Sequence, residues 1–177
     1  TQEAEKARLP FMIDIASVDE VTERNFKYTF RLQPPASLMA NNFLKYGQFI
    51  NTKMDNSIKN IVLVHEDSVF GTSIAEIIEK KAEKEGFKVL ATLPHSASTA
   101  DLSSTINKIK SLKPDAIIAT TYLRDGTLLV DGLKEAKFAE EKIYVAKNLD
   151  DALNKMNELI NKDTVVLLEN DLPDNYL

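Results

Sequence analysis

Short apolar runs alternate with longer amphipathic segments along most of the chain. Runs rich in β-branched residues are typical of strands buried on both faces of a parallel sheet, and they occur at residues 60–65, 88–93, 116–121, 143–146 and 164–168. The segments between them repeat apolar residues at helical spacing. Strands joined by helices of this length pair in parallel through right-handed crossovers. The pattern predicts an α/β fold, a three-layer doubly wound parallel sheet with the flavodoxin-like strand order 2-1-3-4-5.

Capping residues and glycines set the expected helix ends. A helix from Ser73 to Glu85 is expected because Ser73 and Glu76 have capping-box spacing and Gly86 follows as a stop. Asp101 and Asp125 are expected to cap the next two helices. A further helix, predicted over residues 35–50, would cover one face of the sheet.

The first 35 residues fit this core less well. Leu9–Ala16 and Phe26–Leu32 are each predicted as strands, but neither has a place in a five-stranded parallel core. They could extend a sheet edge, pair with each other or form a homodimer interface, since an unpaired apolar edge is a liability. We therefore divide the chain into an N-terminal extension, residues 1–35, and one α/β domain, residues 36–177.

Composition excludes several classes of function. The formal net charge of −5 and the lack of a basic stripe argue against a nucleic-acid partner. No run of 18 apolar residues occurs, so no membrane insertion is expected. The chain has no cysteine, which excludes disulfides and thiolate chemistry. Because no G-x-x-x-x-G-K-[ST] loop is present, we predict no cofactor.

Polar residues at the expected strand ends are the remaining candidates for chemistry. His65, Glu66, Asp67 and His95 would share one rim of the sheet, and imidazoles with carboxylates can hold a transition metal. Their spacing matches no ligand signature, so we predict a solvated acidic rim without a metal. Ser68 lacks the G-x-S-x-G elbow of hydrolases. No catalytic residue is identified, and the chain is not predicted to be an enzyme.

Five segments stand out within residues 1–122: Ala4–Phe11, Tyr28–Arg31, His65–Gly71, Asp101–Ser104 and Lys113–Ala116. Together they resemble the type I periplasmic solute-binding proteins of branched-chain amino-acid and amide importers. In that family two α/β lobes close on a small ligand across a hinge. The resemblance implies that these residues cover the end of one lobe, a hinge crossing and the start of the second lobe. The family is periplasmic, whereas the sequence shows no signal-peptide pattern, so no compartment is assigned.

The same resemblance implies a set of ligand-binding residues. Phe70 and Tyr122 resemble the positions that follow the first and third strands of the second lobe, and Asp125 lies in the same polar loop as Tyr122. Ser17 resembles the polar hinge position that helps to hold a ligand's charged groups. The implied ligand is a small amino acid or amide, which needs both lobes for full burial. Alternatively, Phe70 packs at a strand end and Tyr122 covers the sheet edge.

From about residue 133 onward the chain resembles a different family, the C-terminal domain of Mur-type peptidoglycan ligases. The segments are Glu141–Val145, Asn148–Ala152 and Val165–Tyr176. Two resemblances that meet near residues 121–133 imply a designed chimera, a non-enzymatic α/β scaffold without a complete native function. Two alternatives remain: a small-molecule binding module for amino acids or amides, and a fragment of a peptidoglycan ligase.

Overall fold

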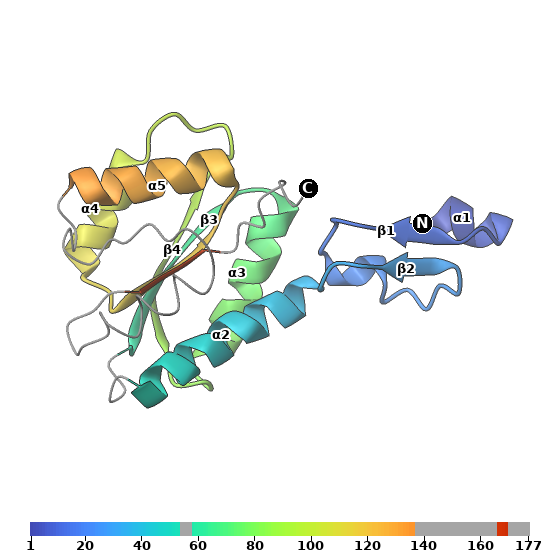
Figure 1. The fold of residues 1–177 in the computed structure, drawn as a ribbon, viewed down its shortest axis with the longest axis horizontal. Helices are drawn as coiled ribbons and strands as arrows, with labels where there is room; N and C mark the ends of the chain where they lie inside the picture. The colour runs from blue at the N-terminus through green and yellow to red at the C-terminus, as the bar shows by residue number, and fades with distance from the viewer. Residues whose placement is uncertain (54–57, 137–165, 170–177) are drawn as a thin grey trace.

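A computed structural model describes residues 1–53, 58–136 and 166–169. Figure 1 shows a parallel sheet with helices on both sides and an N-terminal segment that projects from it. The elements in chain order are α1 (Gln2–Ala7), β1 (Phe11–Ile13), the 3-10 helix η1 (Asp19–Val21), β2 (Thr29–Arg31), α2 (Ala36–Lys53), β3 (Asn60–Glu66), α3 (Val69–Ala82), β4 (Lys88–His95), α4 (Ser103–Leu112), β5 (Ala116–Thr120), α5 (Leu123–Glu135) and β6 (Val166–Glu169).

The main sheet has the order β4-β3-β5-β6, and every pair in it is parallel. Leu63 at its centre pairs with Thr92 of β4 and Ile118 of β5. The α/β class, the parallel pairing and the neighbours expected for the first three predicted strands are confirmed. Apolar runs form these strands because both faces of the sheet are covered.

The strand beside β5 corrects the expected order. Ala116 of β5 pairs with Val166 of β6, so the last predicted strand occupies the place expected for residues 143–146. Those residues lie outside the described part of the chain. Connection rules constrain the handedness of a crossover, but they leave open which later strand returns to a given edge.

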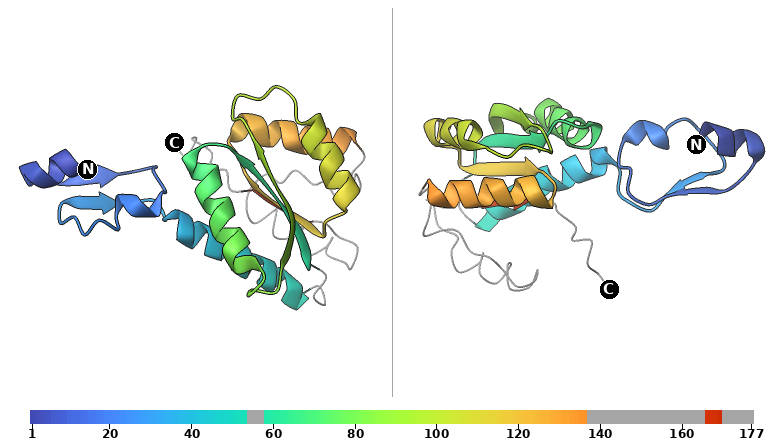
Figure 2. Two further views of the ribbon diagram at one scale, coloured as in Figure 1. Left: turned by 180° about the vertical axis from the view of Figure 1, so that it is seen from behind. Right: turned by 90° about the horizontal axis from the view of Figure 1, so that it is seen from above.

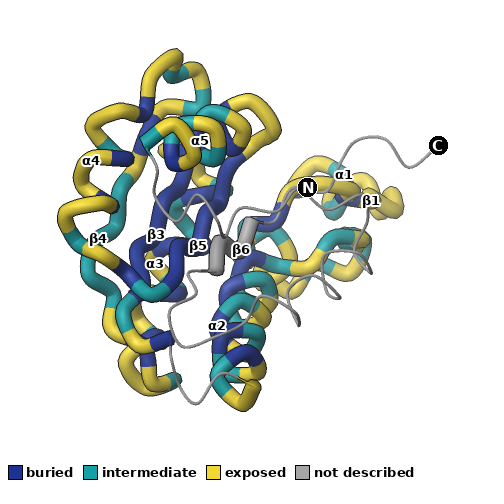
Figure 3. The backbone as a smooth tube through the Cα atoms, turned by 60° about the vertical axis from the view of Figure 1, so that its left-hand side comes forward, coloured by how far each residue is buried: buried dark blue, intermediate teal, exposed yellow. Residues whose placement is uncertain are grey.

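Side chains on the two faces of the sheet enter two separate apolar layers. Ile61 and Leu63 of β3 pack with α2 and α3, whereas Val62 and Val64 pack with α4 and α5. This alternation is the two-residue period of a strand. Figure 3 shows the buried positions concentrated along β3 and β5, between the helix layers.

The positions of the helices follow the sequence pattern, but the expected caps do so only in part. Leu102 and not Asp101 is the N-cap of α4, although Oδ1 of Asp101 accepts the Ser103 N–H at 2.8 Å. α2 and α4 match the expected segments, and Gly86 adopts φ +90°, as expected for a residue that ends a helical segment. However, α3 begins at Val69 rather than at Ser73, and Ser68 is its N-cap, with Oγ accepting a hydrogen bond from the Phe70 N–H at 3.2 Å. The predicted capping box at Ser73 is therefore wrong.

The N-terminal segment forms its own two-stranded sheet. β1 and β2 pair in parallel, with Phe11 opposite Thr29, which is one of the three arrangements considered from the sequence. The Ala36 N–H donates to the Ser17 carbonyl at 2.7 Å and attaches this segment to the start of α2. A homodimer through this segment has no support. Within the described residues, no helix is long and apolar enough to cross a membrane.

Candidate functional site

Two neighbouring strands send their helices to opposite faces of the sheet. α3 follows β3 on the α2 side, whereas α5 follows β5 on the α4 side, as Figure 2 shows from two directions. The loops after β3 and β5 therefore diverge from the carboxyl ends of these strands. In open α/β sheets such a topological switch point is where ligands bind.

An aromatic pair occupies this switch point. Phe70 lies in the first turn of α3 and Tyr122 is the N-cap of α5, and their ring centroids are 5.6 Å apart with a 37° tilt. Tyr122 is 49% exposed, and its neighbour Leu123 and the neighbouring Val69 of α3 are more exposed still. The structure thus brings two of the predicted site residues into contact on an open apolar face. We call Val69, Phe70, Tyr122 and Leu123 the aromatic face.

The buried carboxylate of Glu66 accepts hydrogen bonds from the start of α3. It is fully buried, and Oε1 accepts from the Ser68 hydroxyl and the Gly71 N–H, both at 2.7 Å. Oε2 accepts from the Ser68 N–H at 2.7 Å. A Cβ on Gly71 would overlap the Glu66 carbonyl oxygen and come within 2.9 Å of Oε1. Glu66 therefore has a structural role here, and the expectation of a solvated acidic rim is wrong at this residue.

Asp125 plays the corresponding part at the start of α5. It is fully buried; Oδ1 accepts from the Tyr122 N–H at 3.0 Å, and Oδ2 lies 2.7 Å from Nε2 of His95. The prediction that Asp125 is the N-cap of this helix is wrong: Tyr122 is the N-cap, and Asp125, at the third helical position, accepts the N–H of Tyr122. Both of its oxygens contact groups of the protein itself. A direct contact of Asp125 with a ligand remains a prediction.

Both helix N-termini beside the switch point are thus occupied by carboxylates of the chain itself. The N-terminus of a helix normally attracts anions through its free N–H groups and partial positive charge. Here Glu66 and Asp125 accept N–H groups at these ends and supply negative charge. The helix ends therefore offer little attraction to a ligand carboxylate, and the aromatic face offers mainly apolar contact.

Ser17 lies in the N-terminal segment instead of the strand-end loops. Its carbonyl accepts from the Ala36 N–H at 2.7 Å and from Nη1 of Arg31 at 2.6 Å, and the residue is buried. Arg31 also donates to the Asp19 carbonyl at 3.2 Å. These bonds fix the crossing between the N-terminal segment and α2, and a ligand role for Ser17 remains a prediction.

The acidic and imidazole groups do not form a metal centre in the described part of the chain, where no three such side chains converge. Nδ1 of His65 lies 2.8 Å from the Glu66 carbonyl oxygen, and His95 faces Asp125. Each imidazole thus has a local partner within the protein.

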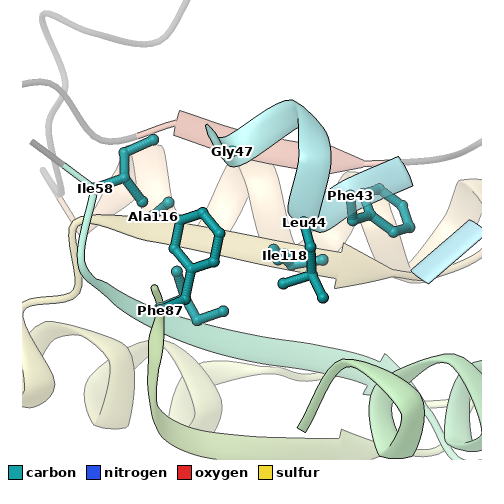
Figure 4. A pocket seen from close by; sticks show the side chains of 8 residues that line it. Phe43, Leu44, Gly47, Ile58, Phe87, Ala116 and Ile118 are labelled. Atoms are coloured by element: carbon teal, nitrogen blue, oxygen red, sulfur yellow. The ribbon is translucent and has the colours of Figure 1, made fainter. Parts of the chain in front are cut away.

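A small apolar pocket lies elsewhere, between α2 and the sheet (Figure 4). The ring of Phe87 packs against Gly47 there, where a Cβ would come within 2.8 Å of the ring. The pocket has no polar side chain in its lining, so it lacks the groups that orient a ligand. We interpret it as a packing gap. Its lining residues are Phe43, Leu44, Gly47, Ile58, Ile61, Phe87, Ala116 and Ile118.

Comparison with known proteins places the chain in a family. Residues 2–168 match the family described as periplasmic binding protein. Leu/Ile/Val-binding protein homolog 8 of Brucella abortus is 30% identical over 141 residues, which cover 78% of this chain and 35% of that protein. Leu/Ile/Val-binding protein homolog 7 of Brucella melitensis is 28% identical over 149 residues, which cover 82% of this chain and 37% of that protein. The chain thus spans little more than a third of the length of these relatives.

Solved structures agree on the fold. An extracellular ligand-binding receptor from Rhodopseudomonas palustris HaA2 superposes with a TM-score of 0.66 at 22% identity, covering 77% of this chain and 37% of that one. A second match is a solute-binding protein of an ABC transporter from Rhodopseudomonas palustris BisB5, solved in complex with 3,4-dihydroxy benzoic acid. It superposes with a TM-score of 0.64 at 15% identity, and the match covers 95% of this chain and 38% of that chain.

These matches decide between the two resemblances seen in the sequence. The family match continues through residues 121–133 and on to residue 168, so the expected junction, the Mur-ligase segment and the designed chimera have no support. The relatives are solute-binding proteins and not enzymes, in agreement with the prediction for this chain. The chain belongs to the periplasmic binding protein family.

Proposed function

We propose that this chain is the ligand-contacting lobe of a solute-binding protein for a small amino acid or amide, and that the aromatic face forms one wall of its binding cleft. The observation that carries the proposal is the contact of Phe70 with Tyr122, 5.6 Å between ring centroids, at the switch point between β3 and β5. Aromatic pairs in this position supply large apolar contact area to a ligand.

The electrostatics of the site indicate which part of the ligand this lobe takes. Because Glu66 and Asp125 already occupy the helix N-termini, the aromatic face suits an apolar side chain better than a carboxylate. The names of the Brucella relatives refer to leucine, isoleucine and valine. Aliphatic amino acids are therefore the first ligands to test, with small amides next and aromatic acids as a contrast.

The test is the affinity of the purified chain for L-leucine, L-valine, propionamide and 3,4-dihydroxybenzoate, measured by ligand-observed NMR titration. One wall of a cleft supplies only part of the contacts, so we expect a Kd on the order of 1 mM, equivalent to about −4 kcal/mol. Binding of an aliphatic amino acid in this range supports the proposal. Failure of all four probes to bind would contradict it.

Two alanine variants locate the binding site. Tyr122→Ala removes a ring of the aromatic face, and Phe49→Ala removes a ring on α2 that has the same 49% exposure and its own aromatic neighbour, Tyr46. Tyr122→Ala is expected to raise the Kd roughly tenfold, while Phe49→Ala leaves it unchanged. Equal effects of the two variants would show that binding occurs elsewhere.

A further inference from the structure

His95 and Asp125 form a buried polar pair directly behind the aromatic face. Nε2 of His95, at the end of β4, lies 2.7 Å from Oδ2 of Asp125, and both side chains are almost wholly shielded from solvent. The two residues are 30 positions apart in the chain. A pair of this kind costs desolvation free energy, so it needs good geometry to persist.

The chemistry of the pair fixes the direction of the hydrogen bond. A carboxylate oxygen accepts hydrogen bonds, so the contact assigns to His95 the tautomer that carries its hydrogen on Nε2 and donates it to Asp125. The other ring nitrogen, Nδ1, is buried and has no hydrogen-bond partner within the described residues. The contact with Asp125 is therefore the polar interaction that orients this ring.

Asp125 transmits this interaction to the aromatic face. Its second oxygen, Oδ1, accepts the N–H of Tyr122 at 3.0 Å, and the Tyr122 carbonyl in turn accepts the Gly126 N–H at 2.9 Å. Tyr122 is thereby held as the N-cap of α5, with its ring 5.6 Å from that of Phe70. A continuous path of hydrogen bonds thus links β4 to a residue of the proposed cleft wall.

We infer that His95 is a positioning residue for ligand binding: by donating to the buried Asp125 carboxylate, it keeps Tyr122 in the orientation that completes the aromatic face. Without this donor, Asp125 would lose one of its partners in a site that water does not reach. A buried carboxylate oxygen left without a donor is unfavourable, and the start of α5 would move to hydrate it. Tyr122 would move with it.

The test compares His95→Gln with His95→Asn. Glutamine places an N–H donor close to the position of Nε2, whereas the asparagine amide is one methylene too short to reach Asp125. His65→Asn is the matched control, because His65 is the other histidine of the chain, is buried at the end of the neighbouring strand and bonds to the Glu66 carbonyl instead of Asp125.

Two measurements are made on each variant of the full chain. The first is independent of ligand: the hydrogen-exchange rate of the Tyr122 amide and the NOE between the Phe70 and Tyr122 rings. The second is the Kd for L-leucine. We expect His95→Asn to speed exchange of the Tyr122 amide roughly tenfold, to weaken the ring NOE and to raise the Kd roughly tenfold. His95→Gln and His65→Asn should leave all three within about twofold of wild type.

The ligand readout rests on the proposed function, but the amide and NOE readouts do not. If wild-type chain binds no L-leucine, the proposed function fails while the Tyr122 amide still decides the positioning role. An unchanged Tyr122 amide and ring NOE in His95→Asn would overturn the inference, as would an equal loss in His95→Gln and His95→Asn. If His95→Asn does not fold, Asp125→Ala is tested for the same loss of Tyr122 amide protection; retained protection there would also overturn it.

Discussion

The close approach of Gly71 to Glu66 gives the sharpest stability prediction. A Cβ at residue 71 would overlap the Glu66 carbonyl oxygen, which belongs to the backbone at the end of β3, and would press on the buried carboxylate. Gly132 is a matched control, because a Cβ there overlaps Cδ1 of Ile106, the mobile end of a side chain. Both glycines are helical, so both variants gain the same intrinsic helix propensity.

The magnitude follows from these contacts. Overpacking against a fixed backbone costs about 2 kcal/mol, and weakening the N–H bond to the Glu66 carboxylate costs about 2 kcal/mol more. Replacement of glycine by alanine in a helix returns about 1 kcal/mol. Gly71→Ala is therefore expected to lower the free energy of unfolding by about 3 kcal/mol. Gly132→Ala should cost less than about 1 kcal/mol, since Ile106 can change rotamer.

Urea unfolding followed by far-UV circular dichroism checks this prediction. With a slope of about 2 kcal/mol per molar urea, Gly71→Ala should lower the unfolding midpoint by about 1.5 M, and Gly132→Ala by less than about 0.5 M. Because Phe70 precedes Gly71, the first variant should also weaken L-leucine binding. Equal midpoints for the two variants would refute the claim that Glu66 fixes the first turn of α3.

The remaining predictions concern two carboxylates. Glu66→Gln keeps one acceptor oxygen but turns an amide N–H₂ toward donors, so it should lower the free energy of unfolding by about 2 kcal/mol. Glu76→Gln, on the exposed side of α3 beside Lys80, should lower it by less than about 0.5 kcal/mol in the same urea assay. Hydrogen bonds from the Ser103 hydroxyl and N–H lower the pKa of Asp101. Ionised Asp101 therefore stabilises the folded chain at pH values above the ordinary aspartate pKa. This stabilisation is lost as the pH falls through the lowered pKa. Asp101→Asn should therefore reduce the loss of unfolding free energy seen below about pH 4 in urea titrations at several pH values. An unchanged pH dependence would contradict the claim that the Ser103 bonds stabilise ionised Asp101.

Much of the sheet could be predicted because its central strands, β3 and β5, are buried on both faces. The apolar runs of β3 and β5 and the helical spacing of Ile106 with Ile109 reflect local periodicity, and the structure uses both as expected. The partner of β5 could not be read in the same way. Strand order depends on long-range packing, and the placement of Val166 beside Ala116 has no local signal.

The two aromatic residues of the candidate site were singled out in the sequence through the family resemblance, whereas the polar contacts behind them were missed. Phe70 and Tyr122 meet because each follows a strand at the switch point. The start of α3 is held by Glu66, a residue of the preceding strand, in addition to its N-cap Ser68. The run of an acid, a serine two residues later and a glycine five residues later is the signal that could have revealed this role of Glu66. The contact of His95 with Asp125 joins distant segments and left no sequence pattern.

The resemblance to Mur-type ligases shows a limit of short motifs. Apolar runs and acidic loops recur in unrelated α/β folds, so a few matching residues near the C-terminal end carried little information. The family match over residues 2–168 integrates the whole pattern and removes the need for a junction.

Protein-observed NMR tests the central claim most directly. Wild-type chain labelled with ¹⁵N is titrated with L-leucine, and the amide shift changes are mapped onto the structure. The account predicts saturable changes concentrated at residues 67–71 and 121–124, on the loops that carry Phe70 and Tyr122. Changes confined to the apolar pocket around Phe87, or to the N-terminal segment, would contradict it.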